Sequence, residues 1–124
     1  MAQFIRLSDA EFEVMRIVWE NESPVSSKTI SKELEEKNWK PQTILTLLAR
    51  LVNKEFLKCE KVNNKNVYYP QIEENHYLEY ETNEFVRKYH NNSVKGLVNT
   101  LSNVKELSND EIDDLKKYLD DLVK

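Results

Sequence analysis

The sequence predicts a mainly α-helical protein that contains one small β-hairpin. Three observations favour this fold class. Gly96 is the only glycine among 124 residues, and folds built from many hairpins need glycine where the backbone φ is positive. Apolar residues recur at helical spacing through most of the chain. Two short runs of strand-forming residues, 56–61 and 67–69, flank a polar stretch and predict the hairpin.

The first helix is predicted to begin after Ser8. Ser8 and Glu11 have the spacing of a capping box, in which each side chain accepts a hydrogen bond from the other residue's backbone N–H. Leu7 and Phe12 flank this cap at the spacing of a hydrophobic staple. The helix is expected to end before Pro24, because proline lacks the backbone N–H that would continue it. The predicted apolar stripe consists of Phe12, Met15, Val18 and Trp19.

A second and a third helix follow at short distance. Ser26 is the expected N-cap of the second, which ends near Lys37 and carries Ile30 and Leu34 as its apolar stripe. Pro41 fits the first position of the third helix, because its φ is preset and no donor is lost there. Its apolar positions have the spacing i, i+3, i+4, i+7 and are Ile44, Leu47, Leu48 and Leu51.

The hairpin follows the third helix, with residues 62–66 as its turn. Asparagines in this turn tolerate left-handed backbone and can replace the missing glycine. Three helices followed by a hairpin are the outline of a winged helix-turn-helix, which we expect to occupy residues 1–71. Cys59 lies in a predicted strand and is expected to be a small core residue.

Residues 72–124 are predicted to be helical again. Asn91 and Asn92 separate two apolar stripes, and Ser108 and Glu111 repeat the capping-box spacing of the first helix. Short amphipathic helices bury too little surface to be stable alone, so we expect an isologous homodimer formed through this region. The predicted dimerisation residues are Leu78, Phe85, Tyr89, Val94, Leu97, Val98, Leu101, Ile112, Leu115 and Leu119.

The charge is distributed unevenly, although the net charge is −4. Residues 37–65 carry seven Lys or Arg against two Asp or Glu, and both flanking segments are acidic. A basic block centred on the third helix and the hairpin is typical of a nucleic-acid interface. We therefore expect double-stranded DNA as the partner.

In a helix-turn-helix the second helix of the motif enters the major groove and contacts base edges near its N-terminus. Here that recognition helix begins at Pro41. Glutamine can pair with adenine, and methyl groups can pack on thymine. The predicted DNA-binding residues are Gln42, Thr43, Leu45, Thr46 and Arg50 on this helix, with Lys54, Lys58, Lys61, Asn64 and Lys65 after it as backbone contacts.

Nothing in the sequence predicts an enzyme, a metal site or a membrane protein. His76 and His90 lack a metal-ligand frame, and no catalytic constellation stands out. The chain begins with no export leader, contains no apolar run long enough to span a bilayer, and has one cysteine. A cytoplasmic protein without a cofactor is expected.

The sequence resembles the penicillinase-repressor family, the BlaI/MecI group of bacterial transcriptional repressors. The resemblance covers almost the whole chain and rests on residues 7–15, 17–19, 39–44, 46–51, 68–69 and 107–112. It implies a dimeric repressor that binds a palindromic operator and controls β-lactamase or related genes. It also implies release from DNA by a membrane sensor-protease pathway that cleaves the C-terminal region. The corresponding position here is Thr100-Leu101, where staphylococcal members have Asn–Phe.

Two alternatives stay open at the level of the sequence. The acidic net charge and Leu45 on the recognition helix would also suit a winged-helix module that binds a protein and not DNA. A metal-responsive repressor of the same superfamily is the other alternative. The copper-responsive branch of the resembled family uses C-terminal Cys-x-Cys pairs, whereas Cys59 is the single cysteine here.

Overall fold

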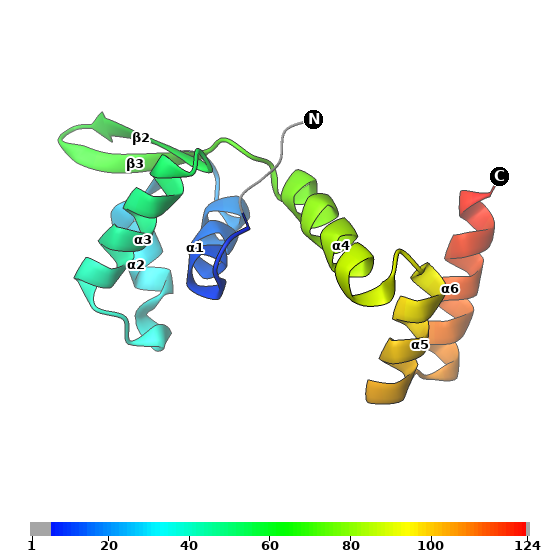
Figure 1. Ribbon diagram of the computed structural model, residues 1–124. Coiled ribbons are helices and arrows are strands. Elements are labelled where there is room, and N and C mark those ends of the chain that lie inside the picture. The colour runs from blue at the N-terminus through cyan, green and yellow to red at the C-terminus, as the bar shows by residue number, and fades with distance from the viewer. Residues whose placement is uncertain (1–5, 124) are drawn as a thin grey trace. The chain divides into compact units, whose positions relative to one another are not determined.

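The structure is a computed structural model that describes residues 6–123, so the start of the chain, where no export leader is expected, lies outside the described part. The mainly helical fold with a small hairpin is confirmed (Figure 1). The elements are α1 (Asp9–Glu20), β1 (Val25–Ser26), α2 (Ser27–Glu33), the 3-10 turn η1 (Glu35–Lys37), α3 (Pro41–Asn53), β2 (Leu57–Val62), β3 (Lys65–Pro70), α4 (Glu74–His90), α5 (Val94–Val104) and α6 (Asn109–Leu122).

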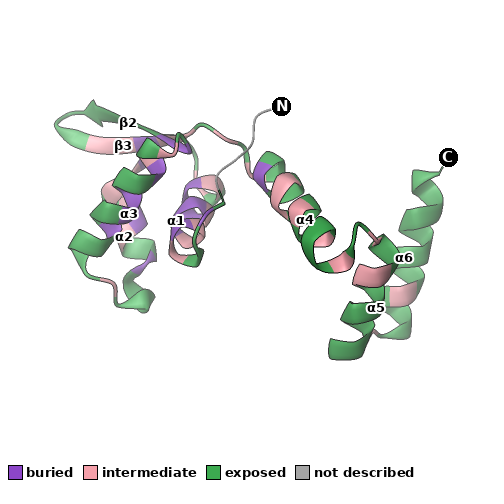
Figure 2. Ribbon diagram, in the orientation of Figure 1, coloured by how far each residue is buried: buried purple, intermediate pink, exposed green. Residues whose placement is uncertain are grey.

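The chain divides into two compact units, which we call the N-terminal unit (Met1–Glu81) and the C-terminal unit (Thr82–Lys124). The N-terminal unit contains α1 to β3 and the first turns of α4. Its core is formed by apolar side chains of α1, α2, α3 and the sheet, shown as buried segments in Figure 2. The four predicted core positions of α3 (Ile44, Leu47, Leu48 and Leu51) are all buried, as expected.

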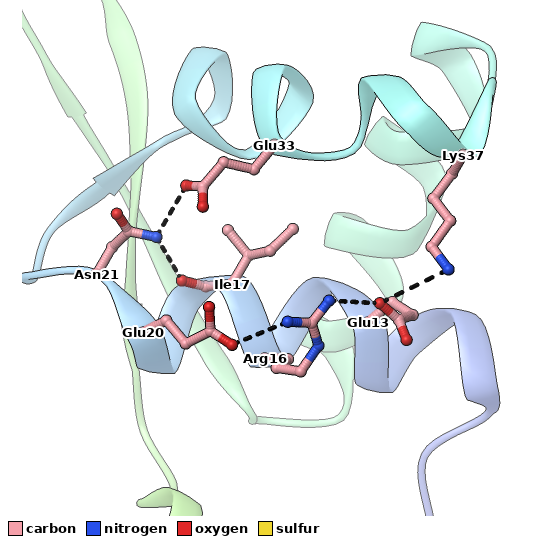
Figure 3. Close-up of polar contacts among 7 residues, drawn as sticks. All are labelled: Glu13, Arg16, Ile17, Glu20, Asn21, Glu33 and Lys37. Carbon is pink, nitrogen blue, oxygen red and sulfur yellow. Dashed lines mark hydrogen bonds and ion pairs between the residues drawn. The ribbon is translucent and has the colours of Figure 1, made fainter.

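Polar contacts define both ends of α1, and one of them links the helix to α2. The capping box predicted at Ser8 and Glu11 is present, with Glu11 N–H donating to Ser8 Oγ at 3.2 Å and Ser8 N–H donating to Glu11 Oε1 at 2.8 Å. At the other end of the helix, Asn21 Nδ2 donates to the Ile17 carbonyl at 2.7 Å and to Glu33 Oε2 at 2.9 Å (Figure 3). The second of these bonds links α1 to α2.

The sheet has three antiparallel strands in the order β1-β3-β2. The sequence did not predict β1, because a strand of two residues is too short to show a period of two. The predicted five-residue turn was also wrong. Val62 pairs directly with Lys65, and Asn63 and Asn64 form a two-residue turn with φ of 52° and 65°, the positive values that such hairpins require.

The prediction that Cys59 is a core residue was wrong, because its side chain is exposed. Only Leu57, the first residue of β2, is buried, and the other five residues of the strand are exposed. β2 is an edge strand of the sheet, and on the central strand β3 the residue opposite Cys59, Tyr68, is buried. A strand pattern alone does not reveal which strand lies at the edge of a sheet.

The first turn of α4 belongs to the core of the N-terminal unit. Tyr77 is buried, and its hydroxyl accepts a hydrogen bond from Leu7 N–H at 3.0 Å. Its ring packs against Phe12, Trp19 and Phe56, with centroid distances between 5.5 and 6.2 Å. The unit accordingly ends inside α4, later than the boundary expected between residues 71 and 72.

Tyr77→Ala is expected to lower the free energy of unfolding of the N-terminal unit by about 3–5 kcal/mol, the usual cost of removing a buried aromatic ring. Tyr77→Phe keeps the ring and loses only the acceptor for Leu7 N–H, so we expect about 1–2 kcal/mol. Urea denaturation of the full chain measures both. A wild-type unfolding midpoint for Tyr77→Ala would contradict the assignment of this turn to the core.

The C-terminal unit consists of capped helices with little buried surface. Asn91 and Asn92 end α4 with positive φ, Ser93 caps α5, and the predicted capping box of Ser108 and Glu111 begins α6. Among residues 82–123, none has a buried side chain. No helix in the part of the chain described by the structure is long and apolar enough to cross a bilayer.

Candidate nucleic-acid interface

The core positions of α3 orient its opposite face toward solvent. Pro41 occupies the first turn, and the N-cap residue Lys40 makes no side-chain capping bond. All five residues predicted to contact DNA on this helix are exposed. Four of them also line one shallow hollow together with Leu47, so they form a continuous surface: Gln42, Thr43, Thr46 and Arg50.

The exposed face of α3 presents both polar and methyl groups. Thr46 Oγ1 donates to the Gln42 carbonyl at 2.9 Å, which orients its methyl group as well as its hydroxyl oxygen. Leu45 is 48% exposed, so its methyl groups are accessible from solvent. The surface therefore offers a bidentate amide, methyl groups and one guanidinium, which are the groups that read A·T and G·C edges in a major groove.

The hairpin places its basic residues on two faces. Successive residues of a strand point to opposite sides of the sheet, so Lys58 and Lys61 lie on opposite faces of β2. Lys65 pairs with Val62 and shares the face of Lys58. The three lysines and Asn64 at the tip are exposed, but the structure does not bring all of them onto one surface.

The two tyrosines of β3 have different environments. Tyr68 lies opposite Cys59 and is buried; burial raises the pKa of its hydroxyl to about 12. Tyr69 lies opposite Lys58 and is partly exposed. Tyr68 is therefore the core residue of the pair, and Tyr69 shares the face of Lys58 and Lys65.

Lys54, predicted as a phosphate contact, has an internal partner. Its Nζ donates to Glu11 Oε1 at 2.6 Å, and the Glu11 side chain is only 2% exposed. Burial alone would raise the pKa of Glu11, but the bonds from Lys54 and from the Ser8 N–H outweigh it and hold the pKa below its ordinary value. The pair joins the last turn of the recognition helix to the first turn of α1.

The sequence identified Glu11 as a capping residue and gave no signal for its second role. Glu11 and Lys54 are 43 positions apart, and their contact depends on how α1 packs against α3. A second hollow, beside this pair, has Arg6, Asp9 and Arg50 in its lining. Arg6 in turn forms an ion pair with Glu81 at 2.9 Å.

The model of the family described as Penicillinase repressor matches residues 7–121. The chain belongs to the penicillinase repressor family. The predicted resemblance is thereby confirmed, and so is the prediction that the protein is a repressor and not an enzyme, because this family consists of transcriptional repressors.

Two relatives are similar to this chain over nearly the whole length of both proteins. The penicillinase repressor of Bacillus licheniformis is 31% identical over 121 residues, covering 98% of this chain and 94% of that protein. The methicillin resistance regulatory protein MecI of Staphylococcus aureus (strain N315) is 34% identical over 114 residues, covering 91% and 92%. Both alignments span the two units.

Two solved structures of BlaI match 62% of this chain. The solution structure of the DNA binding domain of the repressor BlaI has a TM-score of 0.54 and 38% identity, covering 62% of this chain and 94% of that one. The Bacillus licheniformis BlaI monomeric form in complex with the blaP half-operator matches with a TM-score of 0.53 and 38% identity over the same shares. The predicted winged helix-turn-helix is confirmed by this likeness.

The predicted dimerisation residues are accessible in the single chain. Leu97 and Ile112 are half-buried. The others are exposed by 39% or more: Leu78, Phe85, Tyr89, Val94, Val98, Leu101, Leu115 and Leu119. Thr100, the first residue of the cleavage candidate, is exposed in the middle of α5.

Proposed function

We propose that this chain is a homodimeric transcriptional repressor that binds a two-fold symmetric DNA operator. The observation that carries the proposal is the exposed face of α3, where Gln42, Thr43, Thr46 and Arg50 line one hollow on a helix anchored by four buried residues. Such a rigid helix can hold base-contacting groups in register. The relative bound to a half-operator supports the same partner here.

Each part of this surface has a distinct task. Gln42 suits adenine, and the methyl groups of Thr43, Leu45 and Thr46 suit thymine, so we expect half-sites that contain A·T pairs. Arg50 contacts guanine or a phosphate. Lys58 and Lys65, which share one face of the hairpin, contact the backbone together with Asn64 at its tip, which sets affinity and register without reading sequence.

The low burial of apolar side chains in the C-terminal unit supports the proposed dimer. Its described residues bury no side chain, while apolar side chains such as Leu101, Leu115 and Leu119 remain exposed by 43–51%. Exposed apolar stripes on consecutive helices mark a protein–protein contact. A second copy of the same stripes gives a closed two-fold assembly, which matches the symmetry of a palindromic operator.

We further propose that the regulated genes encode β-lactamase or related resistance functions, and that the protein acts in the cytoplasm. The names of the relatives, a penicillinase repressor and a methicillin resistance regulator, support this. Release by a membrane sensor-protease pathway would act at Thr100-Leu101. Cleavage there would cut α5 next to Val98 and Leu101, two of the proposed dimer contacts.

Arg50→Ala tests the DNA surface. We expect weaker binding and a plot of log affinity against log salt that is shallower by about one unit, because one counterion-releasing contact is lost. Fluorescence anisotropy with duplexes selected by the wild-type chain from a random-sequence pool measures both. Lys37→Ala is the control, because it also removes one positive charge. Lys37 lies outside the proposed surface, and its Nζ is 4.0 Å from Glu13 Oε2.

Two outcomes would contradict the proposal. If the wild-type chain selects no duplex at near-physiological salt, the proposal fails and the alternative of a winged-helix module that binds a protein is favoured. If it selects duplexes but Arg50→Ala binds them with unchanged affinity and salt dependence, the exposed face of α3 is not the surface that contacts DNA.

A further inference from the structure

The basic side chains of the N-terminal unit fall into two groups. Four have carboxylate partners, which are Glu81 for Arg6, Glu13 and Glu20 for Arg16, Glu13 for Lys37, and Glu11 for Lys54. The other seven have no ion pair within the described residues 6–81: Lys28, Lys32, Lys40, Arg50, Lys58, Lys61 and Lys65. A cation without an internal partner can neutralise a phosphate at no cost to the fold.

Two of these unpaired cations, Lys28 and Lys32, lie on α2 and outside the interface described above. They are four residues apart, so they share one face of the helix, and both are exposed. They line a hollow of about 540 Å³ together with Trp39, Pro41 and Ile44. Because Pro41 begins α3, the two lysines lie beside the N-terminal end of the recognition helix.

The remaining lining of this hollow is polar. Ser31 and Asn38 contribute a hydroxyl and an amide, which can donate hydrogen bonds, and Glu35 contributes one carboxylate against the two ammonium groups. The hollow therefore carries a net positive charge. Gln42 and Thr43, which directly follow Pro41, line the neighbouring hollow on the DNA-facing side of α3.

A duplex that receives Gln42 and Thr43 in its major groove brings the backbone at the edge of that groove toward α2. In helix-turn-helix proteins the helix before the recognition helix crosses the backbone at this place. We propose that Lys28 and Lys32 bind phosphates of the operator half-site there. The recognition helix is then held between two backbone contacts, α2 on one side and the hairpin on the other. This inference rests on the proposed function.

The assignment also changes which lysines set the salt dependence of binding. Lys54 is engaged with buried Glu11 at 2.6 Å and releases no counterion on binding DNA. Lys28 and Lys32 each release about one, because each neutralises a phosphate that would otherwise hold a condensed cation. Neither contact reads a base, so the loss of both weakens all operator sequences alike.

The experiment compares Lys28→Ala/Lys32→Ala with the wild-type full chain on duplexes that the wild type selects from a random-sequence pool. We expect the slope of log affinity against log salt to become shallower by about two units. In ethylation interference, the double variant should no longer be sensitive to ethylation of the phosphates at the edge of each half-site. It should remain sensitive at the phosphates contacted by the hairpin. Lys28→Arg/Lys32→Arg should restore the wild-type slope, since arginine also neutralises phosphate.

Lys95→Ala/Lys116→Ala is the matched control, because it removes two exposed lysines from α5 and α6 and changes the net charge equally. We expect its slope to equal that of the wild type. An unchanged slope for Lys28→Ala/Lys32→Ala, or an equal loss for the control, would overturn the inference while leaving the proposed function intact. If the wild-type chain selects no duplex, the proposed function itself fails.

Discussion

Leu119→Asp is expected to convert the proposed dimer into monomers and to lower the affinity for a two-fold symmetric operator by roughly 100-fold or more, the usual gain from linking two binding modules. Leu119 lies on α6 in line with Ile112, Leu115 and Leu122, and it is 51% exposed in the single chain. A charge introduced there would be buried without a partner when two chains associate, which is strongly unfavourable.

Sedimentation at micromolar concentration and anisotropy on the selected operator measure the two effects. Asn99→Asp is the control, because it adds the same charge at an exposed position of α5 that is not among the proposed dimer contacts. Leu97→Asp should behave like Leu119→Asp. The dimer proposal fails if the wild type sediments as a monomer, or if Leu119→Asp sediments as a dimer.

Lys54→Ala is expected to destabilise the N-terminal unit by about 2–3 kcal/mol, below the usual 3–5 kcal/mol for a broken buried pair because Lys54 is partly exposed. Its removal leaves the carboxylate of Glu11, which is 2% exposed, without its cation. Urea denaturation at neutral pH measures the loss. Lys61→Ala removes an exposed lysine of the hairpin and should leave the unfolding midpoint unchanged.

The same pair predicts how stability depends on pH. The pKa of Glu11 is lowered in the folded state from an ordinary value of 4.5. Its contribution is therefore fully present above pH 4.5 and is lost as the pH falls through the lower folded pKa. Glu11→Gln should remove this part of the acid sensitivity. If Lys54→Ala unfolds like the wild type at neutral pH and shows the same acid sensitivity, the pair does not stabilise the unit.

The DNA-binding consequence of Lys54→Ala differs from that of Arg50→Ala. At temperatures where the variant stays folded, we expect the slope of log affinity against log salt to remain that of the wild type, because Lys54 donates to Glu11 and we infer that it therefore neutralises no phosphate. A slope shallower by about one unit would instead show that Lys54 contacts DNA.

Local patterns were sufficient to predict most helix boundaries. The capping boxes at Ser8 and Ser108 involve residues three positions apart, so a short stretch of sequence contains both partners. Pro41 at the start of α3 is a similar local signal. The buried stripe of α3 follows from helical periodicity, and the same periodicity indicated which side chains would be exposed for DNA.

One property of the hairpin could have been predicted and was not. Lys58 and Lys61 differ by an odd number of positions, so the period of a strand places them on opposite faces. The prediction from the sequence nevertheless named both lysines as backbone contacts. Lys58 and Lys65, which the strand register brings to one face, form the better pair of backbone contacts.

The amino-acid sequence by itself determined where the helices begin and end, which face of α3 is exposed, and to which family the chain belongs, because each of these depends on neighbouring residues or on a linear pattern. Tertiary structure alone decided that Lys54 pairs with Glu11, that Cys59 is exposed on the edge strand β2, and that Tyr77 completes the core of the N-terminal unit. These outcomes depend on contacts between residues far apart in the chain, or on the order of the strands in the sheet, and local propensity carries no information about either.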